Sequence, residues 1–108
     1  MKLAIGTAQF GSQYGITNQH GIVDIKKAKG ILNLATTHKI QTLDTAFDYN
    51  GAHALLGSLK LKNYKIVSKL PEFKINFNIY ENVKTNLIEI LTTLNVDKLH
   101  GILIHNIS

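Results

Sequence analysis

The stretch LDTAFDYNGAHALLG at residues 43–57 decides how the rest of the sequence is interpreted. It begins within a short apolar strand that ends at Asp44. A short helix then opens at Asn50 or Gly51 and ends at Gly57, where a residue without a side chain fits a helix C-cap. A strand followed by a helix is the repeating unit of folds with parallel sheets.

The same unit recurs on both sides of this stretch. Asp24 is a good N-cap for a helix that runs to about His38 with apolar residues at the 3.6-residue period. Asn78 and Glu81 are spaced as in a capping box, and the helix that follows carries an apolar face as far as Leu94. The strands are short and mostly apolar, and they are expected at residues 2–7, 42–44, 64–69 and 98–105.

The order of these elements predicts an α/β fold with a parallel sheet of about four strands and three helices. Strands that alternate with helices pair in parallel, and strands this apolar fit a sheet with covered faces. The chain has 108 residues, with no linker and no internal repeat. We therefore expect one domain, 1–108, and no second domain.

The composition excludes several classes of protein. The chain has no cysteine, so disulfide frameworks and thiolate chemistry are absent. No apolar run approaches the roughly 18 residues that a membrane helix needs, and the N-terminus does not fit a secretory signal, so we expect a cytoplasmic protein without a membrane partner. The net charge is +5, but its twelve basic residues are all lysines, scattered along the chain. Without arginine or a basic-aromatic motif, nucleic acid is not an expected partner.

Polar side chains stand where three of the predicted strands end. Asp44, Lys69 and His105 are the last residues of their strands, and Tyr49 follows Asp44 in the adjoining loop. The C-terminal ends of parallel strands lie on one rim, where the ligands of such folds bind. The topology alone therefore predicts that Asp44, Lys69 and His105 meet, with Tyr49 in the loop above the same rim.

The alternation of side chains along the strands supports this grouping. Asp44 shares a strand face with Thr42, Lys69 with Val67, and His105 with Leu103. The opposite faces carry apolar residues that suit packing against helices: Leu43, Ile66, Ile102 and Ile104.

Each of these residues also has a purely structural explanation, as a turn former, a solvated strand end or a packed side chain. A metal site is the main alternative, because the chain has five histidines. His100 and His105 are five apart on one strand and so point to opposite faces. We interpret His20, His38 and His100 as surface or packing residues and predict no metal.

These residues resemble the N-terminal part of an aldo-keto reductase. The matching segments occur in the family's order and are GTAQFGSQYGI at 6–16, LDTAFDYNGAHALLG at 43–57, SKL at 68–70 and ILIHN at 102–106. The resemblance implies a (β/α)₈ barrel, of which this chain would form the N-terminal half. It also implies NAD(P)H-dependent reduction of a small aldehyde or ketone, with NADPH as the cofactor.

The resemblance implies a role for each residue of the group. Tyr49 would donate a proton to the carbonyl oxygen, Lys69 would favour the phenolate, Asp44 would orient Lys69, and His105 would position the oxygen. The residues implied to contact the nicotinamide end of the cofactor are Gly6, Thr7, Asp44 and Lys69.

Two positions depart from the family pattern. Many members carry glycine after the tyrosine and an acidic residue four positions after it, where this chain has Asn50 and His53. We favour a surface substitution for His53, because the polar faces of helices are usually exposed. The alternative is that His53 alters substrate preference.

Four strands are half of an eight-stranded barrel, which takes about 250 residues. We therefore expect a piece of a longer enzyme, whose activity needs further strands or self-assembly through the open sheet edges. The alternative function is a non-catalytic half barrel that acts as a relic or as a self-association module.

Overall fold

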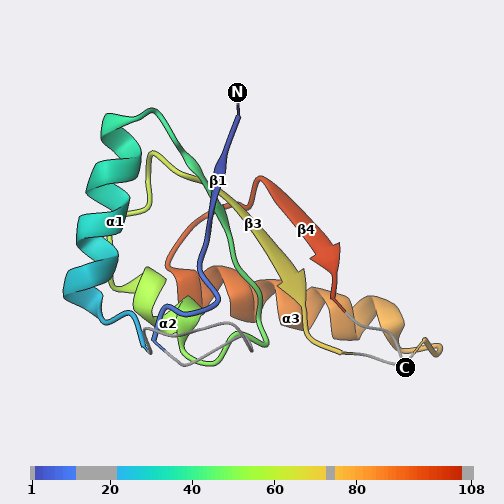
Figure 1. Cartoon of the computed structure of the whole chain (residues 1–108). Helices are drawn as coiled ribbons and strands as arrows, with labels where there is room; N and C mark the ends of the chain where they lie inside the picture. The colour runs from blue at the N-terminus through green and yellow to red at the C-terminus, as the bar shows by residue number, and fades with distance from the viewer. Residues whose placement is uncertain (1, 12–21, 73–74, 106–108) are drawn as a thin grey trace.

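The computed structural model describes residues 2–11, 22–72 and 75–105. It contains one sheet of four parallel strands in the order β1-β2-β3-β4, each paired with the next strand of the sequence (Figure 1). The strands are β1 (Ala4–Gly6), β2 (Thr42–Asp44), β3 (Lys65–Leu70) and β4 (Gly101–Ile104). The predicted fold class, a parallel α/β fold, is confirmed, although β1 and β4 are shorter than the sequence indicated.

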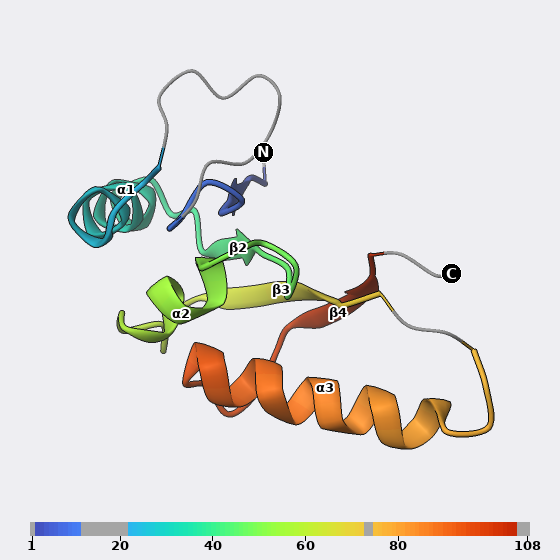
Figure 2. The ribbon, with the colours of Figure 1, turned by 90° about the horizontal axis from the view of Figure 1, so that it is seen from below.

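Three helices connect the strands: α1 (Ile25–Thr37), α2 (Ala52–Gly57) and α3 (Ile79–Leu94). They lie on one side of the curved sheet, and the other side carries no helix in the described part of the chain (Figure 2). The core lies between the sheet and the helices and includes Leu43, Leu56, Ile66, Ile90 and Leu94. Within the described residues, no helix has the length and apolar character that spanning a membrane requires.

The strand register determines which side chains share the helix-free face. Gly6 pairs with Asp44, Asp44 with Val67, and Val67 with Gly101. Because paired residues of a parallel sheet point the same way, these four form one row across that face. Lys69 lies two residues beyond Val67 on the same face, so it comes close to Asp44.

Two predictions about helix ends are wrong. Gly57 is the last residue of α2, and Ser58 is the C-cap. Gly57 is needed for a different reason: a Cβ there would lie 2.0 Å from the carbonyl oxygen of Thr93 in α3. At the start of α3, Asn78 makes no side-chain cap bond, so the predicted capping box does not form. Asn78 instead donates its backbone N–H to the Asn76 side-chain oxygen.

Ile102 and Ile104 lie on the helix-facing side of the sheet as predicted, because they pair with the buried Ser68 and Leu70, but they are less buried than expected. Ile102 borders a hollow with Leu87 and Leu91 of α3. The two residues are 38% and 57% exposed, whereas Leu43 and Ile66 on the inner strands are buried. The reason is that β4 is the outer strand of the sheet and has a neighbour on one side only.

Candidate active site

The site is built around an ion pair at the C-terminal ends of β2 and β3. The Lys69 Nζ lies 2.7 Å from the Asp44 Oδ1 and donates a second hydrogen bond, 2.9 Å long, to the Thr45 carbonyl oxygen. The Lys69 side chain is only 15% exposed. Charge-assisted hydrogen bonds of this kind hold an ammonium group in one position.

Tyr49 lies above this pair, in the turn between β2 and α2. Its ring centroid is 5.1 Å from the Lys69 Nζ. The turn is closed by a bond from the Tyr49 N–H to the Ala46 carbonyl oxygen, and Gly51 caps α2 with a φ of 88°. A side chain at Gly51 would also meet the Gly11 carbonyl oxygen at 3.1 Å, so this position requires glycine for two reasons.

His105 completes the group directly after β4. Its ring packs edge-on against the Tyr49 ring, with centroids 5.9 Å apart and an interplanar angle of 83°. The His105 Nδ1 lies 3.8 Å from the Asp48 Oδ2, a contact that the sequence reasoning missed. The position of Asp48 next to Tyr49 could have indicated this contact, because one turn carries both residues and Tyr49 was expected near His105.

The structure therefore brings together all four residues that the sequence singled out. Asp44 contacts Lys69, Lys69 lies beside the Tyr49 ring, and Tyr49 contacts His105. Asp44 is the last residue of β2, Lys69 lies one residue before the end of β3, and His105 directly follows β4, while Tyr49 lies in the loop after β2. The sequence predicted Lys69 and His105 as the last residues of their strands, and each strand end differs by one residue. Figure 1 shows the strands running in parallel, so their C-terminal ends lie at one edge of the sheet.

Gly6 and Thr7 lie beside this group, at the end of β1. The Thr7 N–H and its hydroxyl each donate a 3.0 Å bond to the Asp44 carbonyl oxygen, and Thr7 is fully buried. In contrast to the buried Thr7, Gly6 borders open space, because a Cβ at this position would meet no atom within 4 Å. Gly6 is exposed, so the backbone beside Asp44 is accessible on the open face of the sheet.

The interpretation of His53 as a surface residue is wrong. His53 is 6% exposed, and its Nε2 lies 2.9 Å from the hydroxyl oxygen of Ser68, which is fully buried. Burial lowers the pKa of His53 from 6.5 to about 4, so its ring is neutral at neutral pH. His53 lies on the buried face of α2 together with Ala52 and Leu56, and not on its polar face.

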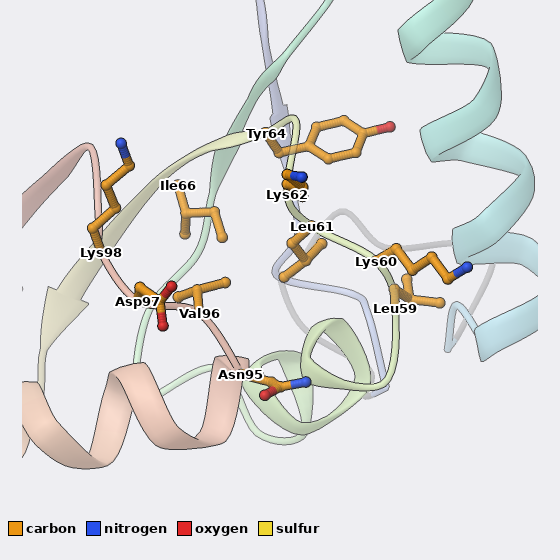
Figure 3. A pocket seen from close by; sticks show the side chains of 10 residues that line it. All are labelled: Leu59, Lys60, Leu61, Lys62, Tyr64, Ile66, Asn95, Val96, Asp97 and Lys98. Atoms are coloured by element: carbon orange, nitrogen blue, oxygen red, sulfur yellow. The ribbon is translucent and has the colours of Figure 1, made fainter.

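A groove of about 490 Å³ lies away from this site, near the start of β3 and the end of α3 (Figure 3). Lys60, Lys62 and Lys98 line it, and the side chains of Lys60 and Lys98 extend away from its centre. Within the described residues, no three histidine or acidic side chains are grouped closely enough to hold a metal ion. His20 lies outside the described residues, and His38 and His100 are exposed.

Comparison with known proteins identifies the family. The model of the aldo/keto reductase family matches residues 2–108, so the chain belongs to this family, and the resemblance drawn from the sequence is confirmed. Two solved structures assigned to the aldo-keto reductases, both from Pseudomonas aeruginosa, are similar over 95% of this chain. Their sequence identities are 27% and 28%, with TM-scores of 0.77 and 0.76. This chain spans only 42% and 40% of their lengths, and no curated protein matches it.

Proposed function

We propose that the chain carries the catalytic residues of a cytoplasmic, NAD(P)H-dependent reductase that converts a small aldehyde or ketone to an alcohol. The observation that carries this proposal is the unbroken series of contacts from Asp44 through Lys69 and Tyr49 to His105. Membership of the aldo/keto reductase family supports the reaction class.

The reaction adds a hydride to the carbonyl carbon and a proton to the carbonyl oxygen. A reduced nicotinamide cofactor, for which we propose NADPH, supplies the hydride when it is bound. Tyr49 donates the proton from its hydroxyl group, as a positioned general acid. The positive charge of Lys69, beside the Tyr49 ring, stabilises the phenolate that remains.

The other two residues of the group hold the reacting groups in position. Asp44 holds the ammonium group of Lys69 at 2.7 Å and keeps it from swinging into solvent. His105 lies on the far side of Tyr49 and donates a hydrogen bond to the substrate oxygen, which sets the oxygen within reach of the Tyr49 hydroxyl.

We further propose that the nicotinamide end of the cofactor binds against Gly6, Asp44 and Lys69. Support comes from the open space that a Cβ at Gly6 would enter, directly beside the ion pair. Thr7 supports this site by fixing the backbone of Asp44, because its N–H and its hydroxyl both donate to the Asp44 carbonyl oxygen.

The test is Tyr49→Phe in the full-length protein, assayed by NADPH consumption with a simple aldehyde. We expect turnover to fall by about 10²–10⁴-fold, because the proton donor is lost. Tyr64→Phe is the matched control, since the Tyr64 hydroxyl bonds the Leu32 carbonyl oxygen at the other end of the molecule. Unchanged turnover in Tyr49→Phe would contradict the proposal.

The outer strands favour a second candidate function, self-association of this half barrel. Leu103 and Ile104 of β4 are more than half exposed, and β1 and β4 each have an unpaired edge within the described residues. We propose that residues 1–108 form the N-terminal half of an eight-stranded barrel, which a second copy could complete. Light scattering of the 108-residue chain tests this, and a stable monomer would contradict it.

A further inference from the structure

We propose that the buried His53–Ser68 pair is a positioning element that sets the distance between Tyr49 and Lys69. This inference rests on the proposed function, in which these two residues act together. His53 lies in α2, four residues after Tyr49, and Ser68 directly precedes Lys69 in β3. The 2.9 Å bond between the His53 Nε2 and the Ser68 Oγ therefore joins the element that carries the proton donor to the strand that carries the cation.

The pair lies on the opposite face of the sheet from Lys69. Successive residues of a strand point to opposite faces, so Ser68 points toward the helices while Lys69 points to the open face. Ser68 is fully buried between its apolar neighbours Ile66 and Leu70. The pair is thus out of reach of any ligand on the open face, and it can act on the reaction only through Tyr49 and Lys69.

Burial keeps this bond in its neutral form. The pKa of His53 is lowered by burial, and its ring meets the Phe47 ring edge-on, with centroids 6.2 Å apart. A neutral imidazole offers one donor and one acceptor nitrogen, and the Ser68 hydroxyl can match either. A buried bond between neutral groups holds its partners in place without the cost of burying a charge.

Backbone hydrogen bonds also join the turn that carries Tyr49 to β3, the strand that carries Lys69. The Phe47 N–H donates to the Lys69 carbonyl oxygen at 3.0 Å, and the Thr45 N–H donates to the Val67 carbonyl oxygen at 2.9 Å. These bonds tie the start of the turn to β3. Within the turn, the Tyr49 N–H donates to the Ala46 carbonyl oxygen and the Ala52 N–H donates to the Tyr49 carbonyl oxygen, each at 3.1 Å, so Tyr49 is joined by backbone bonds to the start of α2. The His53–Ser68 bond adds a polar side-chain link from α2 to β3, next to the apolar packing of Ala52 and Leu56 in the core. It is the link that ties the helix after Tyr49 to the residue next to Lys69.

The experiment compares Ser68→Ala with Tyr64→Phe in the full-length protein. Each variant removes one hydroxyl that forms hydrogen bonds: that of Ser68 to His53, and that of the half-buried Tyr64 to the Leu32 carbonyl oxygen and the Thr36 hydroxyl. Only Ser68 lies beside the site. We expect Ser68→Ala to lower kcat about tenfold with KM for the aldehyde changed less than twofold. We expect Tyr64→Phe to lower Tm to a similar extent and to leave kcat unchanged. An equal fall in kcat in both variants would show a general effect of stability and would overturn the proposal.

A second pair of variants tests the bond itself. His53→Gln keeps an amide that can reach the Ser68 hydroxyl, whereas His53→Leu fills the space without any polar group. We expect the kcat of His53→Gln to lie within threefold of the wild-type value. We expect the kcat of His53→Leu to be about as low as that of Ser68→Ala. Equal kcat values in these two variants would overturn the proposal.

A readout without turnover separates this inference from the proposed function. Tyrosine labelled with ¹³C at Cζ gives one NMR signal per tyrosine, and the Tyr49 signal is the one that disappears in Tyr49→Phe. We expect Ser68→Ala to shift this signal, because the ring moves relative to the Lys69 ammonium group. A fixed signal would overturn the positioning role even if Tyr49 is essential, whereas a shifted signal in a protein that reduces no carbonyl would refute only the proposed function.

Discussion

The two ends of the sheet both carry lysines, but in different surroundings. At the C-terminal end, Lys69 is mostly buried, paired with Asp44 and packed beside Tyr49. At the N-terminal end, Lys60 and Lys98 line an open groove, are exposed, and form no ion pair within the described residues. Positive charge and cavity volume alone would favour the groove, whereas the proposed function uses the other end. There, the buried Lys69 has a fixed position, so its charge acts on Tyr49 with little screening by water.

The largest expected effect comes from removing the lysine at each end in turn. Lys69→Met keeps most of the side-chain volume but removes the charge beside Tyr49, so we expect turnover to fall by about 10²-fold or more. Lys98→Met is the matched control at the other end and should leave kcat within twofold of the wild type. Steady-state rates with NADPH and one aldehyde measure both. Comparable losses in the two variants would remove the distinction between the ends.

The next largest effect is a pH dependence of the free energy of unfolding, which arises from His53 at the C-terminal end of the sheet. The pKa of His53 is about 4 in the folded protein and 6.5 when the chain is unfolded, so between these values the unfolded state binds more protons. The free energy of unfolding should therefore fall as the pH drops from 6.5 to 4, by up to about 3 kcal/mol. Above pH 6.5 this contribution is fully present.

Urea denaturation at about pH 7 and about pH 4.5 measures this dependence. His53→Gln removes the titrating group, so the loss of stability between the two conditions should be smaller in the variant by about 2 kcal/mol. Equal losses in the two proteins would show that His53 is not buried as the structure describes.

Substitutions of two glycines should affect different properties: Gly57→Ala the stability of the fold, and Gly6→Ala the binding of the cofactor. A Cβ at Gly57 would lie 2.0 Å from the Thr93 carbonyl oxygen, so Gly57→Ala should force α2 and α3 apart and cost about 1–3 kcal/mol of stability. A Cβ at Gly6 would enter open space, so Gly6→Ala should leave Tm unchanged and weaken NADPH binding about tenfold. Thermal melts and fluorescence titration with NADPH check the pair. Unchanged NADPH affinity in Gly6→Ala would place the cofactor elsewhere.

Much of the fold and of the candidate site could be predicted from local sequence patterns. Short apolar strands that alternate with amphipathic helices indicated the parallel sheet, and the period of two along β3 placed Lys69 on the face opposite to Ile66. The meeting of Asp44, Lys69 and His105 followed because parallel topology gathers strand ends on one rim. These inferences needed only the residue type and its position in an element.

The errors concern contacts between elements that are far apart in the sequence. The role of Gly57 depends on a carbonyl group of α3, and no pattern near Gly57 reports that distance. His53 was assigned to the surface on the general behaviour of helices, but α2 packs against both the sheet and α3. One signal was available: Ser68 is a polar residue on the covered face of β3, and a buried hydroxyl needs a partner.

The smallest expected effect tests whether polar residues near the site end contribute only to stability. The Asp24 Oδ1 accepts the Lys27 N–H at 2.9 Å at the start of α1, whereas Asn78 makes no such bond at the start of α3. Asp24→Ala should therefore lower the free energy of unfolding by about 1 kcal/mol, and Asn78→Ala by less than about 0.5 kcal/mol. Neither side chain touches the Asp44–Lys69 pair, so kcat should stay unchanged in both variants. A larger loss of stability in Asn78→Ala than in Asp24→Ala would restore the capping box at α3, and a fall in kcat in either variant would extend the site to the helix starts.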